Sequence, residues 1–163
     1  MADLTITERL QPSLLDRLTD DRRDSATESR DDWLIDMRRL RDIVLRDLSW
    51  LINTTNSGLD LTDYPHAATS TLNYGLDSIS GMSAGAARAT ALRQSILRAI
   101  ALYEPRLKSG TLDVRVGGGG SDRSAHLIYD IRADLWAQPL PAELYLRTKV
   151  DMSTGEAVIS RSG

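Results

Sequence analysis

One short motif in this chain has the residue spacing of a catalytic nucleophile. Residues 81–85, Gly-Met-Ser-Ala-Gly, match the G-x-S-x-G pattern of serine hydrolases. In those enzymes the serine follows a hydrophobic strand of a large parallel sheet. Here the segment before the motif, residues 76–80, is short and polar. Ser83 is better interpreted as the N-cap of a helix, because its hydroxyl can accept a hydrogen bond from the first helical turn. Hydrolysis by Ser83 is the less favoured alternative.

A second candidate is the tripeptide Glu104-Pro105-Arg106, which places a carboxylate and a guanidinium group two residues apart. Proline ends a helix, and in the extended backbone that follows, residues two apart point the same way. Glu104 and Arg106 can therefore form a two-pronged polar contact, with Pro105 setting the turn between them. The residue types leave two interpretations open: a protein-binding contact, or a solvated ion pair that contributes little stability.

Other residues with catalytic potential give weaker signals. Glycoside hydrolysis needs two carboxylates across a cleft, one of them kept protonated. The carboxylates that can be placed lie on helix faces, on polar strand faces or in linkers, and Arg106 beside Glu104 favours an ion pair over a proton donor. His66 and His126 are far apart in sequence and form no recognisable metal cluster. We expect no catalytic residue, no cofactor and no metal ion.

Composition limits the class of protein. The chain has 163 residues, a formal charge of −3 and no cysteine. This length suits one domain, and the lack of cysteine fits a reducing compartment. The slightly acidic balance argues against nucleic-acid binding, and we find neither a signal peptide nor an apolar run that would insert into a membrane. The sequence predicts a soluble cytoplasmic domain.

The N-terminal residues 1–29 form a predicted extension. Leu14, Leu15 and Leu18 make a short amphipathic stripe, and a highly charged stretch follows at residues 20–25. Such a stripe on a polar linker is typical of a docking peptide that binds a groove on a partner. The alternative is that the stripe folds back onto its own domain.

Residues 30–163 are predicted to form an α+β domain. Apolar residues recur at helical spacing over residues 30–52 and 83–108, where two long helices are expected. The charged residues of the first helix, including Arg46 and Asp47, are interpreted as a solvated face. Residues 67–74 are expected to form either a short strand or a helical turn. Apolar and polar residues then alternate over 112–116, 127–135, 144–150 and 157–159, which predicts an antiparallel meander with one buried face.

The last two strands carry a further prediction. Glu143, Tyr145, Arg147 and Lys149 fall on one solvated face of the 144–150 strand. Such charges guard an exposed strand edge against indiscriminate pairing, so we expect 144–150 and 157–159 to present an edge to another protein. Tyr145, Arg147 and Lys149 are therefore candidate protein-binding residues. From the alternation alone, Val158→Pro is expected to block that edge.

Five segments carry a family resemblance, in the same order along the chain: residues 10–18 (LQPSLLDRL), 47–54 (DLSWLINT), 64–75 (YPHAATSTLNYG), Glu104-Pro105-Arg106 and 151–155 (DMSTG). Together they resemble TssE, the baseplate wedge subunit of bacterial type VI secretion systems, and the corresponding wedge protein of contractile phage tails. The strongest element is Glu104-Pro105-Arg106, which matches the Glu-Pro-Arg signature of that family. The glycine-rich residues 117–121 depart from the family pattern.

The resemblance implies a structural role in the cytoplasm, at the membrane-docked baseplate of a Gram-negative bacterium. TssE-like proteins sit with the wedge proteins TssF and TssG, near TssK, and link the baseplate to the first ring of the TssB–TssC sheath. It also implies that Glu104, Pro105 and Arg106 make the assembly contact, and that the C-terminal hairpin resembles the strand-exchange unit of the sheath. Two alternatives are a peptidoglycan-cleaving enzyme, because phage relatives have carried a lysozyme label, and a small adaptor of the same fold.

Overall fold

The computed structural model describes residues 13–19, 37–79, 81–82, 85–117, 126–136, 142–151 and 153–161. The helical elements are α1 (Leu14–Leu18), α2 (Met37–Ile52), α3 (Pro65–Ala68), η3 (Thr71–Asn73), α4 (Ala86–Tyr103) and η4 (Ser109–Thr111). The strands are β1 (Asp113–Val116), β2 (His126–Leu135), β3 (Ala142–Asp151) and β4 (Ala157–Arg161). The α+β prediction is confirmed. The charged linker, Ser83 and most of the glycine-rich segment lie outside the described residues.

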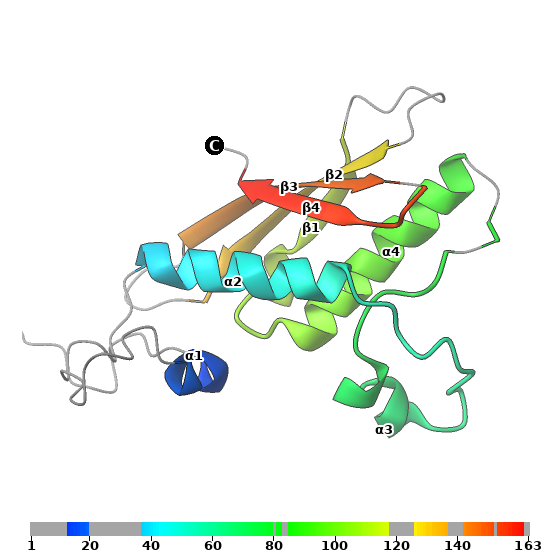
Figure 1. Cartoon of the computed structure of the whole chain (residues 1–163), viewed down its shortest axis with the longest axis horizontal. Helices are drawn as coiled ribbons and strands as arrows, with labels where there is room; N and C mark the ends of the chain where they lie inside the picture. Colours follow the sequence, from blue (N-terminus) through cyan, green and yellow to red (C-terminus); the bar gives the residue numbers. More distant parts are fainter. Residues whose placement is uncertain are drawn as a thin grey trace, which may run out of the picture.

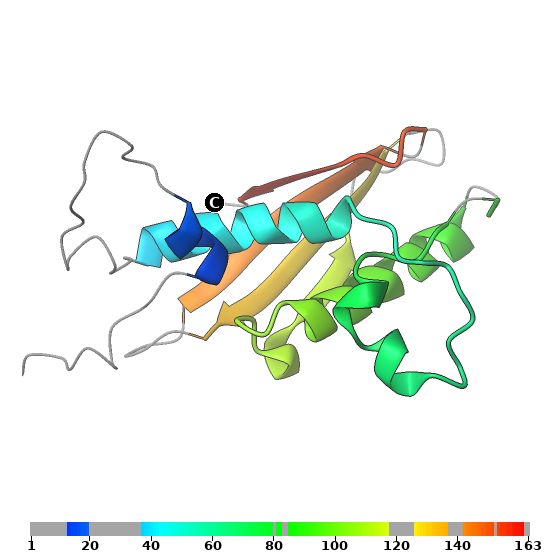
Figure 2. The same ribbon diagram turned by 60° about the horizontal axis from the view of Figure 1, so that its bottom comes forward.

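The strands form one antiparallel sheet in the order β1-β2-β3-β4, so each strand pairs with its neighbour in sequence. Helices α2 and α4 pack against one face of this sheet, with α2 under β4 and α4 under β1 (Figures 1 and 2). The alternation of β3 explains the two layers, because Leu144, Leu146, Thr148 and Val150 are buried while residues 143, 145, 147 and 149 are exposed.

The core lies between the two long helices and the sheet. Helix α2 contributes Val44 and Leu48, and α4 contributes Ile96 and Ile100, all of them buried at helical spacing. The Tyr129 side chain of β2 is also fully buried, and its hydroxyl donates a hydrogen bond to the Ala89 carbonyl at 3.0 Å. This bond satisfies the polar end of an aromatic side chain in the core.

A lobe formed by residues 53–78 connects the two long helices and contains α3 and η3. Residues 67–74 contain the end of α3 and the whole of η3, so the choice between a strand and a helical turn is settled in favour of helical turns. The Tyr103 hydroxyl at the end of α4 bonds the carbonyl oxygens of Ser70 (3.1 Å) and Asn73 (2.8 Å). Gly75 has a φ of 122°, and a Cβ there would lie 2.5 Å from the Thr54 carbonyl oxygen. Only glycine fits where the lobe returns to the end of α2.

Candidate protein-binding site

The Glu104-Pro105-Arg106 turn begins where α4 ends. Tyr103 is the last helical residue and Glu104 is its C-cap, so the predicted stop before Pro105 is confirmed. Two backbone bonds tie the turn to the end of β2: Trp136 N–H donates to the Arg106 carbonyl (2.6 Å), and Lys108 N–H donates to the Asp134 carbonyl (2.9 Å). The turn is therefore fixed to both layers of the domain.

Glu104 and Arg106 form a two-pronged ion pair, as their spacing predicts. Arg106 Nε lies 2.6 Å from Glu104 Oε1, and Nη2 lies 2.5 Å from Oε2. Glu104 is only 3% exposed, and the Arg106 side chain is 26% exposed. The alternative of a solvated ion pair is therefore wrong. Pro105 turns the chain, so that the neighbouring side chains of Glu104 and Arg106 face each other.

The ion pair continues into a longer chain of charged groups, which we name the charge network. Arg106 Nη2 also donates to Asp47 Oδ2 at 2.7 Å. The other oxygen of Asp47, Oδ1, accepts from Arg46 Nε (2.9 Å) and Nη2 (2.7 Å). Arg46 Nη1 donates to Asp16 Oδ1 of α1 at 2.6 Å. The network thus joins α1, α2 and the end of α4, and it contains three carboxylates and two guanidinium groups.

Electrostatics favour the charged forms of Arg106 and Asp16 in this network. Burial by itself would lower the pKa of Arg106, but the hydrogen bonds and the Coulombic attraction of Glu104 and Asp47 outweigh it and raise that pKa. Burial would likewise raise the pKa of Asp16, but the hydrogen bonds from Arg46 and Ser13 outweigh it and hold that pKa below its usual value. Charged partners that stabilise each other suit a structural contact rather than proton transfer.

One edge of the network faces outward. Within the described residues, Arg106 uses Nε and Nη2 for Glu104 and Asp47, and its Nη1 has no hydrogen-bond partner. Because this side chain is partly exposed, two N–H donors remain for a carbonyl or carboxylate of another protein. Glu104, by contrast, is enclosed. The two charged residues of the motif therefore have different surroundings, which their spacing does not reveal.

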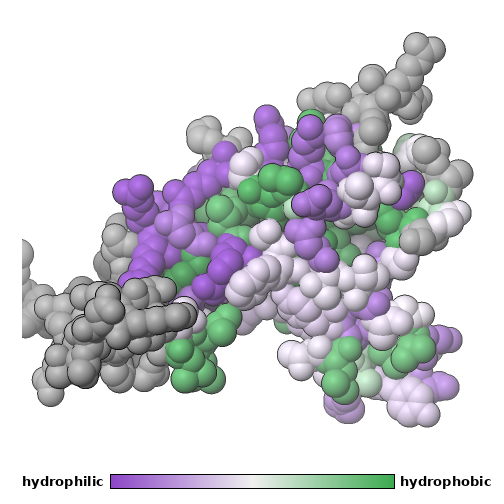
Figure 3. Space-filling view, in the orientation of Figure 1, coloured by the Kyte–Doolittle hydropathy of each residue, from purple (hydrophilic) through white to green (hydrophobic). Residues whose placement is uncertain are grey.

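The predicted leucine stripe lies beside the network. Leu14, Leu15 and Leu18 are 71%, 48% and 75% exposed, so they do not complete the core of their own domain. Figure 3 shows α1 as a hydrophobic projection at one end of the molecule. Trp50 of α2 is also half exposed, and the Arg46 guanidinium lies 4.9 Å from its ring centroid. Apolar and charged binding groups are thus adjacent around Arg46.

The remaining candidates lie on the sheet. Tyr145, Arg147 and Lys149 are exposed on the outer face of β3, and Arg147 pairs with Asp130 of β2 at 2.7 Å. The prediction that residues 144–150 form part of an edge is wrong for residues 146–150, which pair with β2 on one side and with β4 on the other. Among the described residues, Leu144 and Tyr145 pair with β2 alone. Charges on the solvated face of a central strand follow the same alternation as those of an edge strand.

Strand β4 provides the edge at that end of the sheet. The amide of Asn53, at the end of α2, bonds both backbone groups of Ala157: Nδ2 lies 2.9 Å from the carbonyl oxygen, and Oδ1 lies 2.8 Å from the nitrogen. Ala157 therefore points its backbone groups away from β3, and by alternation so do Ile159 and Arg161. Val158 points its backbone groups toward β3, so Val158→Pro would break the sheet itself rather than block the edge.

Sequence reasoning missed Asp16, Arg46, Asp47 and Asn53 as parts of these sites. Arg46 and Asp47 were assigned to a solvated face, but both are only partly exposed and are bridged to other elements. Their partners lie 30 and 59 residues away in the chain, so no local spacing indicates these contacts. Asn53 lies just after a helix, where turn-forming residues are expected. Its residue type is explained by the turn, so the sequence gives no separate signal for its contact with β4.

A protein-family model described as baseplate wedge protein gp25 matches residues 38–140, more than half of the chain. The chain belongs to the gp25 baseplate wedge family. The match includes Arg46, Asp47 and the whole Glu104-Pro105-Arg106 turn, whereas α1, β3 and β4 lie beyond it. No curated protein and no solved structure matches the chain.

Membership in the gp25 family establishes a coarse role. The protein is a structural component of a phage-tail-like baseplate and interacts with other baseplate components. Within the described part of the chain, every helix is too short or too polar to cross a bilayer. The charge network with the adjoining α1 leucines, and the edge of β4, are the candidate surfaces for contacts with neighbouring subunits.

Proposed function

We propose that this gp25-family protein is the TssE-type wedge subunit of a type VI secretion system. It acts in the cytoplasm at the membrane-docked baseplate, binds TssF and TssG near TssK, and links them to the first ring of the TssB–TssC sheath. The charge network is the observation that carries this proposal, because it holds the Glu-Pro-Arg turn rigidly and leaves donors of Arg106 facing outward. Rigid, pre-oriented donors bind with little loss of conformational entropy.

In this proposal the residues of the turn have distinct roles. Arg106 binds a carbonyl or carboxylate of a wedge partner through Nη1. Glu104 and Asp47 hold the guanidinium group from its inner side, at 2.5–2.7 Å, and so fix its direction. Pro105 sets the backbone so that Glu104 and Arg106 face each other. A bidentate carboxylate partner on the inner side restricts a guanidinium group far more than a single contact does.

The leucine stripe is proposed as a second contact with the wedge. Residues 1–29 then act as a docking extension of the 30–163 domain, in which Leu14, Leu15 and Leu18 enter an apolar groove of a neighbouring subunit. The exposure of all three leucines on a five-residue helix supports this role. So short a helix does not stay folded by its own propensity, and the Asp16–Arg46 ion pair positions it.

The free edge of β4 is proposed as the contact with the sheath. An extended segment of a sheath subunit would add beside Ile159 and Arg161, whose backbone groups point outward, while Tyr145, Arg147 and Lys149 line the adjoining outer face. An exposed strand edge is a template for this kind of strand addition.

We also propose that the protein has no peptidoglycan-cleaving activity. Glu104, the most enclosed of the described carboxylates, is held in an ion pair with Arg106, and a general acid must instead carry a proton. No observation favours an adaptor role over the baseplate role.

The test is a substitution that keeps a positive charge beside Glu104 and Asp47 and removes the guanidinium group with its outward donors. Arg106→Lys retains a positive charge near Glu104 and Asp47 but loses the planar fork and its Nη1 group. We expect the variant to unfold cooperatively and to show about tenfold or greater weakening of co-purification with TssF and TssG. Foci of a fluorescent sheath subunit should then be lost in cells.

Arg98→Lys is the matched control, because Arg98 lies on α4 and forms an exposed ion pair with Asp77. This control should bind TssF and TssG normally. If Arg106→Lys also binds normally and supports sheath foci, the proposed contact through Arg106 is wrong.

A further inference from the structure

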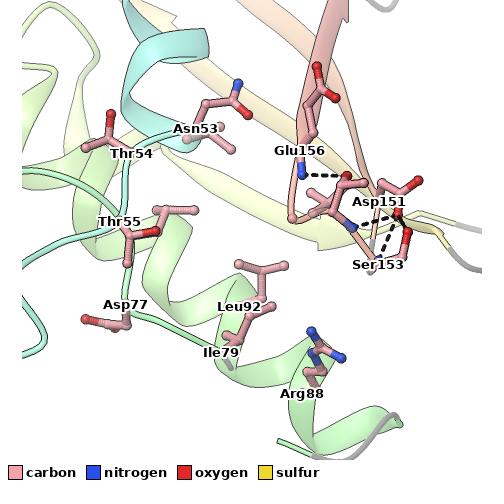
Figure 4. Close-up of a pocket in the computed structure, with 15 residues that line it drawn as sticks. Asn53, Thr54, Thr55, Asp77, Ile79, Arg88, Leu92, Asp151, Ser153 and Glu156 are labelled. Atoms are coloured by element: carbon pink, nitrogen blue, oxygen red, sulfur yellow. Dashed lines mark hydrogen bonds between the residues drawn. The ribbon is translucent and has the colours of Figure 1, made fainter. Parts of the chain in front are cut away.

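A second polar site lies near the start of α4, whereas the charge network lies at the end of that helix. A pocket of about 490 Å³ is lined by the residues after α2, the returning segment of the lobe at residues 76–79, the start of α4 and the turn between β3 and β4. Leu76 and Leu92 are buried and form its apolar wall. Figure 4 shows Arg88 extending from α4 into the space between that helix and the β3–β4 turn.

Arg88 is the only cationic residue among the described residues that line this pocket. Its Nε is buried and has no hydrogen-bond partner in the described structure. A buried guanidinium donor without an acceptor costs free energy, so it marks a place where an acceptor is missing. The helix start adds to the positive potential, because the N-cap of α4 is Gly85, which has no side chain to cap the exposed N–H groups.

The carboxylates around the pocket do not neutralise Arg88. Asp77 accepts from Asn56 Nδ2 at 2.8 Å and pairs with Arg98. Asp151 accepts from the Ser153 hydroxyl (2.5 Å) and the Ser153 N–H (2.8 Å) within its own turn. Figure 4 shows the Glu156 carboxylate turned away from Arg88. Each of these three carboxylates is thus bound to another group or points away from Arg88.

We propose that this pocket binds a single carboxylate group of a peptide through Arg88, with the short aliphatic part of that residue against Leu76 and Leu92. Within the described residues Arg88 Nε lacks an acceptor, and its single positive charge matches one negative charge. A phosphate group would bring additional charge next to Asp77, Asp151 and Glu156, and like charges at close range repel one another. The source is either an acidic side chain or a C-terminal carboxylate, since both present the same two oxygens to a guanidinium fork.

The site is independent of the proposed type VI role and of the Arg106 contact, because it shares no residue with the charge network. Its test uses the full chain and small probes. The nuclear magnetic resonance signal of the Arg88 Nε–H group is followed during titration with N-acetylglycine, with the α-amide of N-acetylaspartate, and with inorganic phosphate. The first probe carries a C-terminal carboxylate and the second carries only a side-chain carboxylate.

We expect a saturable shift of the Arg88 signal with at least one carboxylate probe, and the probe that binds more tightly identifies the source. Arg88→Gln should weaken that binding about tenfold or more. Arg115→Gln, whose ion pair with Asp113 on β1 shares no residue with this pocket, should leave the affinity unchanged. The titration of the unaltered chain decides the matter if Arg88→Gln fails to fold.

Three results would overturn the proposal. The first is the absence of a saturable shift with either carboxylate. The second is tighter binding of phosphate than of both carboxylates, which would make the site a phosphate site. The third is a displaced Arg88 signal in Glu156→Gln without any probe, because it would mean that Arg88 is already paired within the chain.

Discussion

At the scale of single residues, burial separates the roles of two side chains that look equivalent in the sequence. Glu104 is enclosed and, among the described residues, its carboxylate is hydrogen-bonded to Arg106, whereas Arg106 reaches two carboxylates and is still partly exposed. Removing the buried carboxylate of Glu104 takes a partner from the guanidinium group of Arg106 and lowers the stability of the fold. Removing the outward donors of Arg106 lowers only the affinity for a partner. We therefore expect the replacement of Glu104 to lower the stability of the fold.

We predict that Glu104→Ala lowers the free energy of unfolding by about 3 kcal/mol, because it leaves Arg106 partly buried with only one carboxylate partner. Urea denaturation measures this change. Arg98→Ala, which breaks an exposed pair, should cost about 0.5 kcal/mol or less. Equal small losses in both variants would mean that the Glu104–Arg106 pair does not stabilise the fold.

At the scale of elements, the turn between β3 and β4 depends on one carboxylate. Asp151 Oδ1 accepts hydrogen bonds from the hydroxyl of Ser153 and from the N–H groups of Ser153 and Thr154. These bonds lower the pKa of Asp151 to about 2, and the bond from the Ser153 hydroxyl contributes most to this change. The turn fixes the start of β4, and so the alignment of the edge that follows.

The low pKa predicts how the stability of this hairpin changes with pH. A carboxyl group with a depressed pKa in the folded state stabilises that state when it is ionised. The contribution of Asp151 is therefore complete above about pH 4 and is lost as the pH falls toward about 2. Urea denaturation of the unaltered chain and of Asp151→Asn measures this contribution as the difference between their free energies of unfolding.

That difference should shrink steadily across this pH range. Other carboxylates titrate there too, but they contribute to both proteins and cancel in the comparison. A difference that does not change with pH would show that ionised Asp151 is not what stabilises the turn.

Alternate residues of β4 point their backbone groups toward β3 or away from it, and a pair of substitutions can test this assignment. Ile159→Pro removes an outward N–H while sparing the bonds to β3, whereas Val158→Pro removes a bond within the sheet. We predict that Ile159→Pro leaves a folded protein that still binds the wedge proteins but does not initiate sheath assembly, followed by fluorescence of a sheath subunit. Ile159→Ala keeps the N–H and is the control for loss of the half-buried side chain.

Sheath assembly by the folded Ile159→Pro variant would exclude the β4 edge as the docking surface. Failure of Ile159→Ala as well would assign the effect to packing of the side chain. Val158→Pro should be less stable than either variant, since it weakens the pairing of β4 with β3 itself.

At the scale of the whole molecule, the proposed surfaces are formed by different elements of one small domain. The charge network ties the end of α4 to α1, and the β4 edge lies at the far side of the sheet from β1. A subunit built in this way can hold two neighbours at once without a moving part. Repetition of the subunit around a ring would multiply weak contacts into a stable assembly.

Deletion of residues 1–28 tests the docking extension. The thermal midpoint should change little, because the α1 leucines are exposed and Arg46 keeps its contact with Asp47. Co-purification with the wedge proteins should weaken. The double variant Leu14→Ser and Leu18→Ser, which keeps Asp16, should weaken it to a similar extent. A large fall in the midpoint would instead make α1 part of the folded core.

The sequence by itself determined the class of fold and the position of the turn. Helical spacing in α2 and α4 and alternation in β2 and β3 are local patterns, and Pro105 ends a helix through its own backbone. These properties depend on residues a few positions apart, so periodicity identifies them. The two-pronged contact of Glu104 and Arg106 belongs to the same class, because the two residues are only two positions apart in the chain.

Only the tertiary structure decided which of these groups are buried and what they touch. Asp47 lies 59 residues from Arg106, and Asn53 lies 104 residues from Ala157. No sequence spacing relates such pairs, because the chain brings them together only when the helices pack on the sheet. The same holds for β3, whose alternation identifies its solvated face, while the pairing of residues 146–150 with β4 decides that this part of the strand is not an edge. Burial and strand order are properties of the packed layers, and local residue patterns do not contain them.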